Sequence, residues 1–187
     1  MELKKLIIIL FGIGSVAALV YEIAWIRPIQ FVLGSTAYTL SIIFAAFMAG
    51  LALGSKIMSK YLHRIHNTVQ TYALVELCIG LYGILLLWLL PFLPKIYNNL
   101  YILHTNFYLF EFALAITVFV LLLIPTSLMG AAWPLVSKLY IHKSVGKDVS
   151  KLYFANNIGA IIGCVLAGLV FIPLFGIKSS VVLAGIM

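Results

Sequence analysis

Five apolar segments, each about as long as a lipid bilayer is thick, constrain the fold of this chain more than any other feature. A helix needs about 20 apolar residues to cross about 30 Å of hydrocarbon. Segments of that kind lie at 5–26, 36–57, 69–93, 109–130 and 152–173, and a shorter one lies at 179–187. Hydrophobic residues make up 64% of the chain and charged residues 9%, whereas soluble domains average about 25% charged residues. The sequence therefore predicts an all-α polytopic membrane bundle, with five full spans and a truncated sixth in a single domain over residues 1–187.

The two ends of the chain raise separate questions. Lys4 and Lys5 precede an apolar run that is longer than the roughly 7–15 residues of a signal-peptide core, which favours a retained first span over a cleaved signal. The last segment, 179–187, is too short to cross a bilayer as a helix. We therefore expect either a fragment of a longer chain or a final segment that a partner completes.

Lysine and arginine counts predict the orientation. With the N-terminus in the cytoplasm, the inner segments hold nine of these residues: Lys4, Lys5, Lys56, Lys60, Arg64, Lys138, Lys143, Lys147 and Lys151. The outer segments then hold three: Arg27, Lys95 and Lys178. Because cytoplasmic loops are enriched in these residues, we expect a multi-pass protein of the plasma (inner) membrane with a cytoplasmic N-terminus. The net charge of +7 follows this topology, so no nucleic-acid partner is expected.

The stretch 21–27, YEIAWIR, places an acid, a base and two aromatic residues at the end of the first apolar run. Charged groups inside a membrane face protein, water or one another, and they are functional candidates by default. Glu22 and Arg27 are therefore expected either to form a structural ion pair or to hold a ligand. Tyr21 and Trp25 are expected to mark the outer membrane boundary.

Glu76 is the deepest acid, about 10 Å inside the inner end of the third span at 1.5 Å per residue. A carboxyl without a partner in an apolar environment is expected to hold a proton at neutral pH. Glu76 is thus the leading candidate for a proton-linked or cation-linked site, and the alternative is an ion pair with Lys56 or Lys60. Asp148, by contrast, is expected to be solvated.

Two asparagines, Asn156 and Asn157, begin the fifth span inside the membrane boundary. Because buried amides need hydrogen-bond partners, at least one is expected to bond to another helix. His63 and His66 lack further ligands at suitable spacing, so no metal site is expected. The sequence shows no phosphate-binding loop and no nucleophile motif, so we expect no catalytic residues and no cofactor, and enzymatic activity is left open.

Glycines recur at four-residue spacing in two spans, as Gly50 and Gly54 in the second and Gly159 and Gly163 in the fifth. Such stripes let membrane helices approach closely. They are expected to serve either general helix packing or equivalent positions of a three-plus-three inverted repeat, as in transporters. A protein partner or a homo-oligomer formed through these faces is also expected.

The fourth span carries Pro125, Gly130 and Pro134 near its inner end. Each proline removes a backbone donor and crowds the preceding turn. A hinge or a broken helix is therefore expected there, with a simple kink as the alternative.

Several stretches together resemble one known membrane module, the multi-span N-terminal domain of fused transmembrane spermidine synthase-like proteins, also described as major-facilitator/spermidine-synthase fusions. The matching stretches are 21–27 (YEIAWIR), 33–35 with Tyr38, 45–55 (AAFMAGLALGS), 125–134 (PTSLMGAAWP), 153–159 (YFANNIG) and 171–176 (FIPLFG). They follow the order of that family over nearly the whole chain.

In the fused proteins a soluble aminopropyltransferase-like domain follows the membrane domain, whereas this sequence stops inside the sixth span. The resemblance therefore implies a membrane domain, or an assembly subunit that serves a partner or a missing soluble domain. The alternative is a small transporter-like protein, half of a major-facilitator-like bundle, that handles a cation or a polyamine.

Overall fold

The computed structural model describes residues 2–101, 107–141 and 145–187, and the regular structure in these ranges is entirely helical. The α-helices are α1 (Glu2–Leu33), α2 (Ala37–Tyr61), α3 (Thr68–Leu89), α4 (Leu93–Leu100), α5 (Phe107–Tyr140), α6 (Val145–Leu166) and α7 (Ile172–Ile186). Short 3-10 turns, η1 (Leu62–Arg64) and η2 (Leu90–Phe92), and a π-helical segment, η4 (Ala167–Phe171), connect some of them. The predicted all-α class is confirmed, and Lys143 lies outside the described residues.

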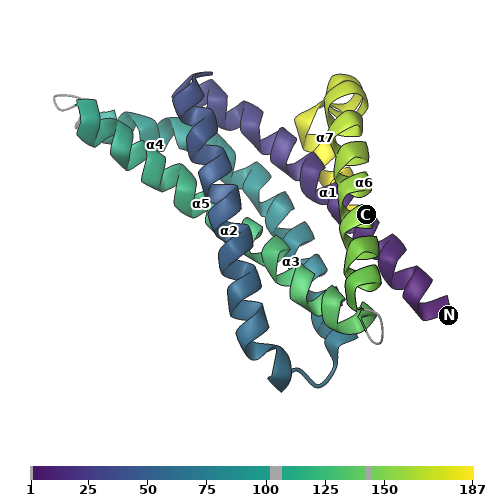
Figure 1. Ribbon diagram of the computed structural model, residues 1–187. Coiled ribbons are helices and arrows are strands. Elements are labelled where there is room, and N and C mark those ends of the chain that lie inside the picture. Colours follow the sequence, from purple (N-terminus) through teal and green to yellow (C-terminus); the bar gives the residue numbers. More distant parts are fainter. Residues whose placement is uncertain (1, 102–106, 142–144) are drawn as a thin grey trace.

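Five helical segments of the described chain are long and apolar enough to cross a membrane: Lys4–Leu33, Ala37–Arg64, Thr68–Leu100, Tyr108–Tyr140 and Val145–Ile186. The first continues past the expected end at residue 26. The last contains a reversal at Gly176, whose φ of 76° and ψ of 170° are not helical. After Gly176 the chain returns toward the middle of the bundle (Figure 1), so the short sixth segment is a separate helical arm.

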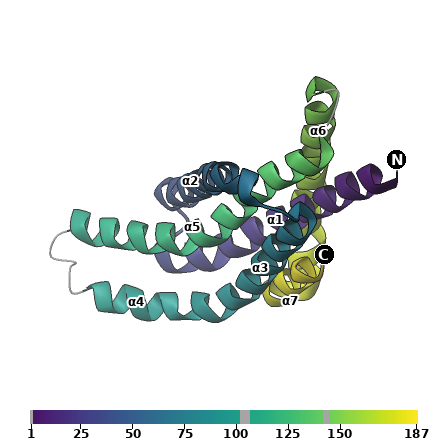
Figure 2. The ribbon, with the colours of Figure 1, turned by 90° about the horizontal axis from the view of Figure 1, so that it is seen from below.

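Helix α1 runs through the centre of the bundle and contacts α6, α7 and α5. The other extensive contacts join α2 to α5, and α3 to both α5 and α7. Seen from below, α2 lies beside α5, and α3 lies beside α7 (Figure 2). The largest buried cluster forms where these helices meet, around Trp25 on α1.

Tyr21 and Trp25 belong to this core. They are 1% and 0% exposed, and their rings stack with centroids 5.2 Å apart. The Trp25 ring also packs against Phe47 of α2, at 6.3 Å. Their position at the outer membrane boundary stays a prediction, and the structure adds that α1 continues to Leu33 and that neighbouring helices bury both side chains.

Gly50 and Gly54 bring α2 into backbone contact with α5. A methyl group at Gly50 would overlap the Thr126 side chain, and one at Gly54 would overlap the Ser127 backbone. From the opposite side, Gly130 faces the backbone of Leu51. Lipid supplies no hydrophobic driving force between helices, so close van der Waals contact between the two backbones stabilises the pairing of α2 with α5.

The same arrangement joins α1 to α6. A methyl group at Gly159 would overlap the Gly12 carbonyl, and one at Gly163 would overlap the Val16 backbone. Like Gly50 and Gly54, both glycines are buried inside the chain. These glycine faces therefore contact other helices of the same chain. A protein partner or a second copy would have to bind a different surface, not the glycine faces that the sequence predicted.

Helix α5 stays helical through Pro125 and Pro134, so the broken helix expected there is not observed. Pro125 has no N–H to donate to the Leu121 carbonyl one turn earlier. The Tyr82 hydroxyl of α3 donates to that carbonyl instead, at 3.2 Å. Such replacement by a neighbouring side chain explains why the helix persists, and a hinge at Gly130 stays a prediction.

Charged side chains join helices to one another at the end of the bundle that carries most of the lysines. Lys4 Nζ lies 3.8 Å from the carboxylate of Asp148, which begins α6 and is 6% exposed. The expectation of a solvated Asp148 is therefore wrong, because the start of α1 passes over the first turn of α6. Lys138 Nζ donates to the carbonyls of Leu62 and Ile65, at 2.8 and 3.1 Å, beyond the end of α2.

We predict that Gly54→Ala destabilises the protein by about 1–3 kcal/mol, because the added methyl group forces α2 and α5 apart. The measurement is thermal unfolding in mild detergent, followed by tryptophan fluorescence. Gly168→Ala is the control, since a methyl group there meets no atom within 4 Å. Equal melting temperatures for the two variants would contradict the close contact.

Candidate functional site

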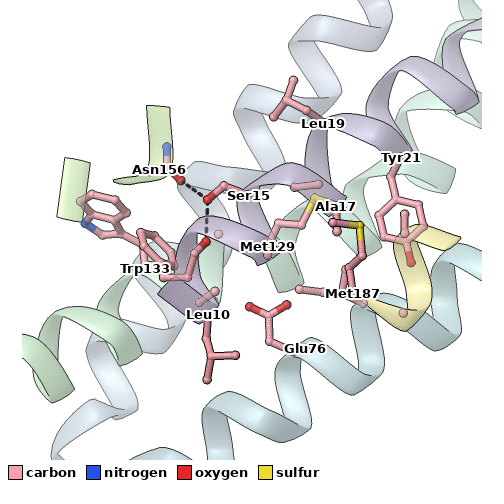
Figure 3. Close-up of a pocket in the computed structure, with 18 of the residues that line it drawn as sticks. Leu10, Ser15, Ala17, Leu19, Tyr21, Glu76, Met129, Trp133, Asn156 and Met187 are labelled. Atoms are coloured by element: carbon pink, nitrogen blue, oxygen red, sulfur yellow. Dashed lines mark hydrogen bonds between the residues drawn. The ribbon is translucent and has the colours of Figure 1, made fainter. Parts of the chain in front are cut away.

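A cavity of about 720 Å³ lies inside the bundle, between α1, α2, α3, α5, α6 and α7. Its walls are mainly apolar, and the side chains that bring polar atoms to it are Ser15, Tyr21, Glu22, Ser55, Tyr72, Glu76, Trp133 and Asn156. Small-molecule sites commonly measure about 300–1,000 Å³ and combine apolar walls with a few polar groups. Figure 3 shows several of these side chains around the cavity, which is the candidate functional site.

Helical spacing explains how the two acids reach one cavity. Four of the nine α1 residues that line the cavity recur every four positions: Leu10, Gly14, Ala18 and Glu22. On α3, Tyr72 and Glu76 are also four residues apart. Residues at this spacing share one face of a helix. Glu22 and Glu76 therefore line the same cavity from two different helices, α1 and α3.

The Glu76 carboxyl lies beside Gly14 of α1, where an added methyl group would come within 3.1 Å of Oε1. The Tyr72 hydroxyl, one turn earlier on α3, is placed to donate a hydrogen bond to the same carboxyl. Among the described residues, no lysine or arginine nitrogen lies within 4.0 Å of Glu76. The alternative of an ion pair with Lys56 or Lys60 is therefore not observed.

Glu22 and Arg27 do not form the expected ion pair either. Glu22 is half-buried and lines the cavity, whereas Arg27 is exposed and does not line it. Five residues on a helix of 3.6 residues per turn place the two side chains on different faces. Within the described ranges, Glu22 has no lysine or arginine nitrogen within 4.0 Å.

Asn156 joins α6 to α1. Its side chain and the Ser15 hydroxyl are 2.9 Å apart, and Ser15 also donates to the Phe11 carbonyl at 2.8 Å. Asn156 lines the cavity beside this contact (Figure 3). Asn157 does not line it, and the structure gives its side chain no hydrogen bond within the described chain. Of the two asparagines, Asn156 is the one that bonds across helices.

The Tyr21 hydroxyl is buried, and it has no hydrogen-bond partner among the described residues. It lies 3.0 and 3.1 Å from the positions that a Cβ would take at Gly83 and Gly185. These glycines of α3 and α7 make room for the phenol ring. The Trp25 indole nitrogen is likewise unpartnered within the described chain, but Trp25 does not line the cavity.

Among the lining residues that sequence reasoning missed are Gly14, Tyr21, Tyr72 and Trp133. A signal for two of them was present, since Tyr72 precedes Glu76 by four residues and Gly14 precedes Glu22 by eight. The role of Tyr21 depends on α3 and α7, which no local pattern relates to α1. Of the residues predicted in the fourth span, Gly130 lines the cavity and the two prolines do not.

The chemistry of the lining favours a positively charged guest. No lining residue is a lysine, an arginine or a histidine, whereas two are glutamates. The described residues contain no group of three or more His, Cys, Asp and Glu side chains that could hold a metal ion. The cavity thus offers hydrogen-bond acceptors and aromatic faces within apolar walls.

Comparison with known proteins gives one relevant similarity. The chain is 21% identical over 182 residues to a protein named polyamine aminopropyltransferase from Oceanobacillus iheyensis. The alignment covers 94% of this chain and 32% of that protein, so the chain spans about a third of the length of the relative. No family model matches the chain, and no solved structure matches it.

We predict that Asn156→Ala lowers the free energy of unfolding by about 1 kcal/mol, because hydrogen bonds between membrane helices contribute about 0.6 kcal/mol on average and up to about 2 kcal/mol. The neighbouring Asn157→Ala is the matched control, because Asn157 makes no bond across helices within the described residues. Thermal unfolding of both variants in one detergent checks this. A larger loss at Asn157 than at Asn156 would contradict the assignment.

Proposed function

We propose that the chain is a membrane domain that works with a soluble aminopropyltransferase-like part, attached to it or supplied by a partner. The observation that carries the proposal is the alignment of nearly the whole chain with about a third of a polyamine aminopropyltransferase. The sequence contains no catalytic motif, so the chemistry belongs to the remaining two thirds of such a protein. The proposed role of this chain is to hold that chemistry at the membrane.

The charge distribution supports a cytoplasmic docking side. Lys4, Lys56, Lys60, Arg64 and Lys138 belong to the start of α1, the end of α2, η1 and the end of α5, which all lie toward the lower side of Figure 1. The positive-inside rule assigns that side to the cytoplasm. In the proposal, the soluble part lies on this side of the plasma (inner) membrane, and the N-terminus is cytoplasmic.

We expect this chain, purified from its native membrane in mild detergent, to carry aminopropyltransferase activity in a soluble domain or in a stoichiometric partner. Native mass spectrometry before and after subunit dissociation separates these two cases. A chain of 187 residues alone, or a homodimer without a soluble component, would contradict the proposal and favour the second candidate below.

The second candidate is a transporter-like protein that moves a cation or a polyamine, and the cavity with its two carboxyls favours it. The helix contacts also agree with a three-plus-three repeat that relates α1, α2 and α3 to α5, α6 and α7. Under this relation the α2–α5 contact corresponds to α6–α1, and α3–α5 corresponds to α7–α1. The relation exchanges α1 with α5 and α3 with α7, so it leaves the α1–α5 and α3–α7 contacts unchanged. Transporters with such repeats bind substrate at the repeat interface.

Individual residues support the same relation. Gly50 and Gly54 meet Thr126 and Ser127, as Gly159 and Gly163 meet Ser15 and Val16. This pairs Thr126 with Ser15, and each hydroxyl donates to the carbonyl four residues earlier, at 2.7 and 2.8 Å. These parallels support the proposed repeat, although the sequences of the two halves share little.

We predict that, if the second candidate holds, liposomes containing the protein accumulate labelled spermidine in a saturable manner. Glu76→Gln is expected to lower the uptake at least tenfold, because it removes the charge beside Gly14. Glu111→Gln is the matched control, since that carboxyl does not line the cavity. Equal uptake by empty liposomes and by liposomes with the protein would exclude this candidate.

A further inference from the structure

We propose that the cavity binds an alkyl diammonium ion, with one amino group at the Glu76 carboxyl and the other at the Glu22 carboxyl. This inference rests on the cavity of the second candidate function and names the chemical class of its ligand. It requires binding only, so it holds whether or not the ligand crosses the membrane.

Charge is the first argument. Two glutamates line the cavity, and no described lysine or arginine nitrogen lies within 4.0 Å of either of them. An ionised carboxylate in an apolar environment is costly unless it is paired. A cationic guest supplies the missing partner, and two separate carboxyls supply positions for two positive charges.

The walls favour an organic cation over a divalent metal ion. Calcium takes about 6–8 oxygen ligands at about 2.3–2.6 Å, and magnesium demands octahedral oxygen geometry. The described residues provide no group of three potential metal ligands. The cavity instead measures about 720 Å³ and is lined largely by leucine, alanine, methionine and aromatic side chains. Such walls suit methylene groups between two charged ends.

The separation of the acids sets the length of the guest. The Glu76 carboxyl lies beside Gly14, and Glu22 lies eight residues further along α1. At 1.5 Å per residue this is about 12 Å along the helix axis. Helical side chains lean toward the N-terminus, so the Glu22 carboxyl reaches back and shortens the gap. A flexible chain of several methylene groups fits between the two acids.

Tyr21 supplies an independent observation. It lines the cavity, it is 1% exposed, and its hydroxyl has no hydrogen-bond partner within the described chain. On α1 it directly precedes Glu22, and its ring packs against Gly83 of α3. Figure 3 shows Tyr21 and Glu76 at the same cavity, on α1 and α3. The hydroxyl oxygen can accept a hydrogen bond from an ammonium group.

The test measures binding of straight-chain diamines by the purified chain in nanodiscs of zwitterionic lipid. The probes are diaminobutane, diaminohexane, diaminooctane and diaminodecane, with octylamine and octanol for comparison. We expect saturable binding with an optimum length in the diamine series. The best diamine should bind at least tenfold more tightly than octylamine, and octanol should bind more weakly still.

Three substitutions test which residues bind the diamine. Glu76→Gln should weaken diamine binding at least tenfold. Glu22→Gln should reduce the affinity for diamines to that for octylamine. Gly14→Leu should block all amines while leaving both charges in place, because its side chain fills the space beside Glu76. Gly12→Ala and Glu111→Gln are the controls, since neither residue lines the cavity, and circular dichroism verifies the fold of each variant.

Several outcomes would overturn the inference. Octanol binding as tightly as the diamines would mean a purely apolar cavity. Unchanged diamine binding by Glu76→Gln and Glu22→Gln would place the ligand elsewhere. Glu76-dependent binding of sodium, potassium or magnesium ions in place of amines would mean an inorganic site. Diamine binding without uptake by liposomes would support the inference and reject transport, so the two proposals fail separately.

Discussion

Backbone contact at two glycine pairs is the interaction on which the rest of this structure depends. Helices in lipid gain nothing from hiding apolar side chains, so they associate where backbones come close enough for dense van der Waals contact. Gly50 and Gly54 achieve this between α2 and α5, and Gly159 and Gly163 achieve it between α6 and α1. These contacts fix four of the long helices as two pairs. Helices α3 and α7 then close the space between the pairs, and the cavity lies in that space.

The cavity follows from small residues as much as from charged ones. Gly14 leaves room for the Glu76 carboxyl, and Gly83 and Gly185 leave room for the Tyr21 ring. Larger residues would fill these places and turn the centre of the bundle into an ordinary apolar core. Instead Glu22, Glu76 and Tyr21 line one space, and the Tyr21 hydroxyl has no hydrogen-bond partner among the described residues. Buried polar groups are costly without partners, and a positively charged guest relieves that cost.

The two candidate functions make different uses of the same architecture. As a membrane domain of an aminopropyltransferase-like system, the bundle needs only its fold and its lysine-rich end. As a transporter-like protein, it needs the cavity and the relation between α1–α3 and α5–α7, which places the cavity where the two halves meet. A site for diamines is compatible with both, because a membrane domain can also hold or sense the compounds that an attached enzyme handles.

The sequence by itself determined the all-α class, the apolar segments and the identity of the important small and acidic residues, because these depend on local length, spacing and composition. Helix ends were less predictable: α1 continues past Arg27 through Pro28, a residue that locally disfavours a helix, and ends at Leu33 before Gly34, whose φ is 86°. Tertiary structure alone decided that Glu22 and Glu76 share a cavity, that Tyr21 and Trp25 are buried, and that Tyr82 replaces the hydrogen bond lost at Pro125. Each of these depends on which helices become neighbours. That choice is made by the fit of distant surfaces, which no pattern within a single helix specifies.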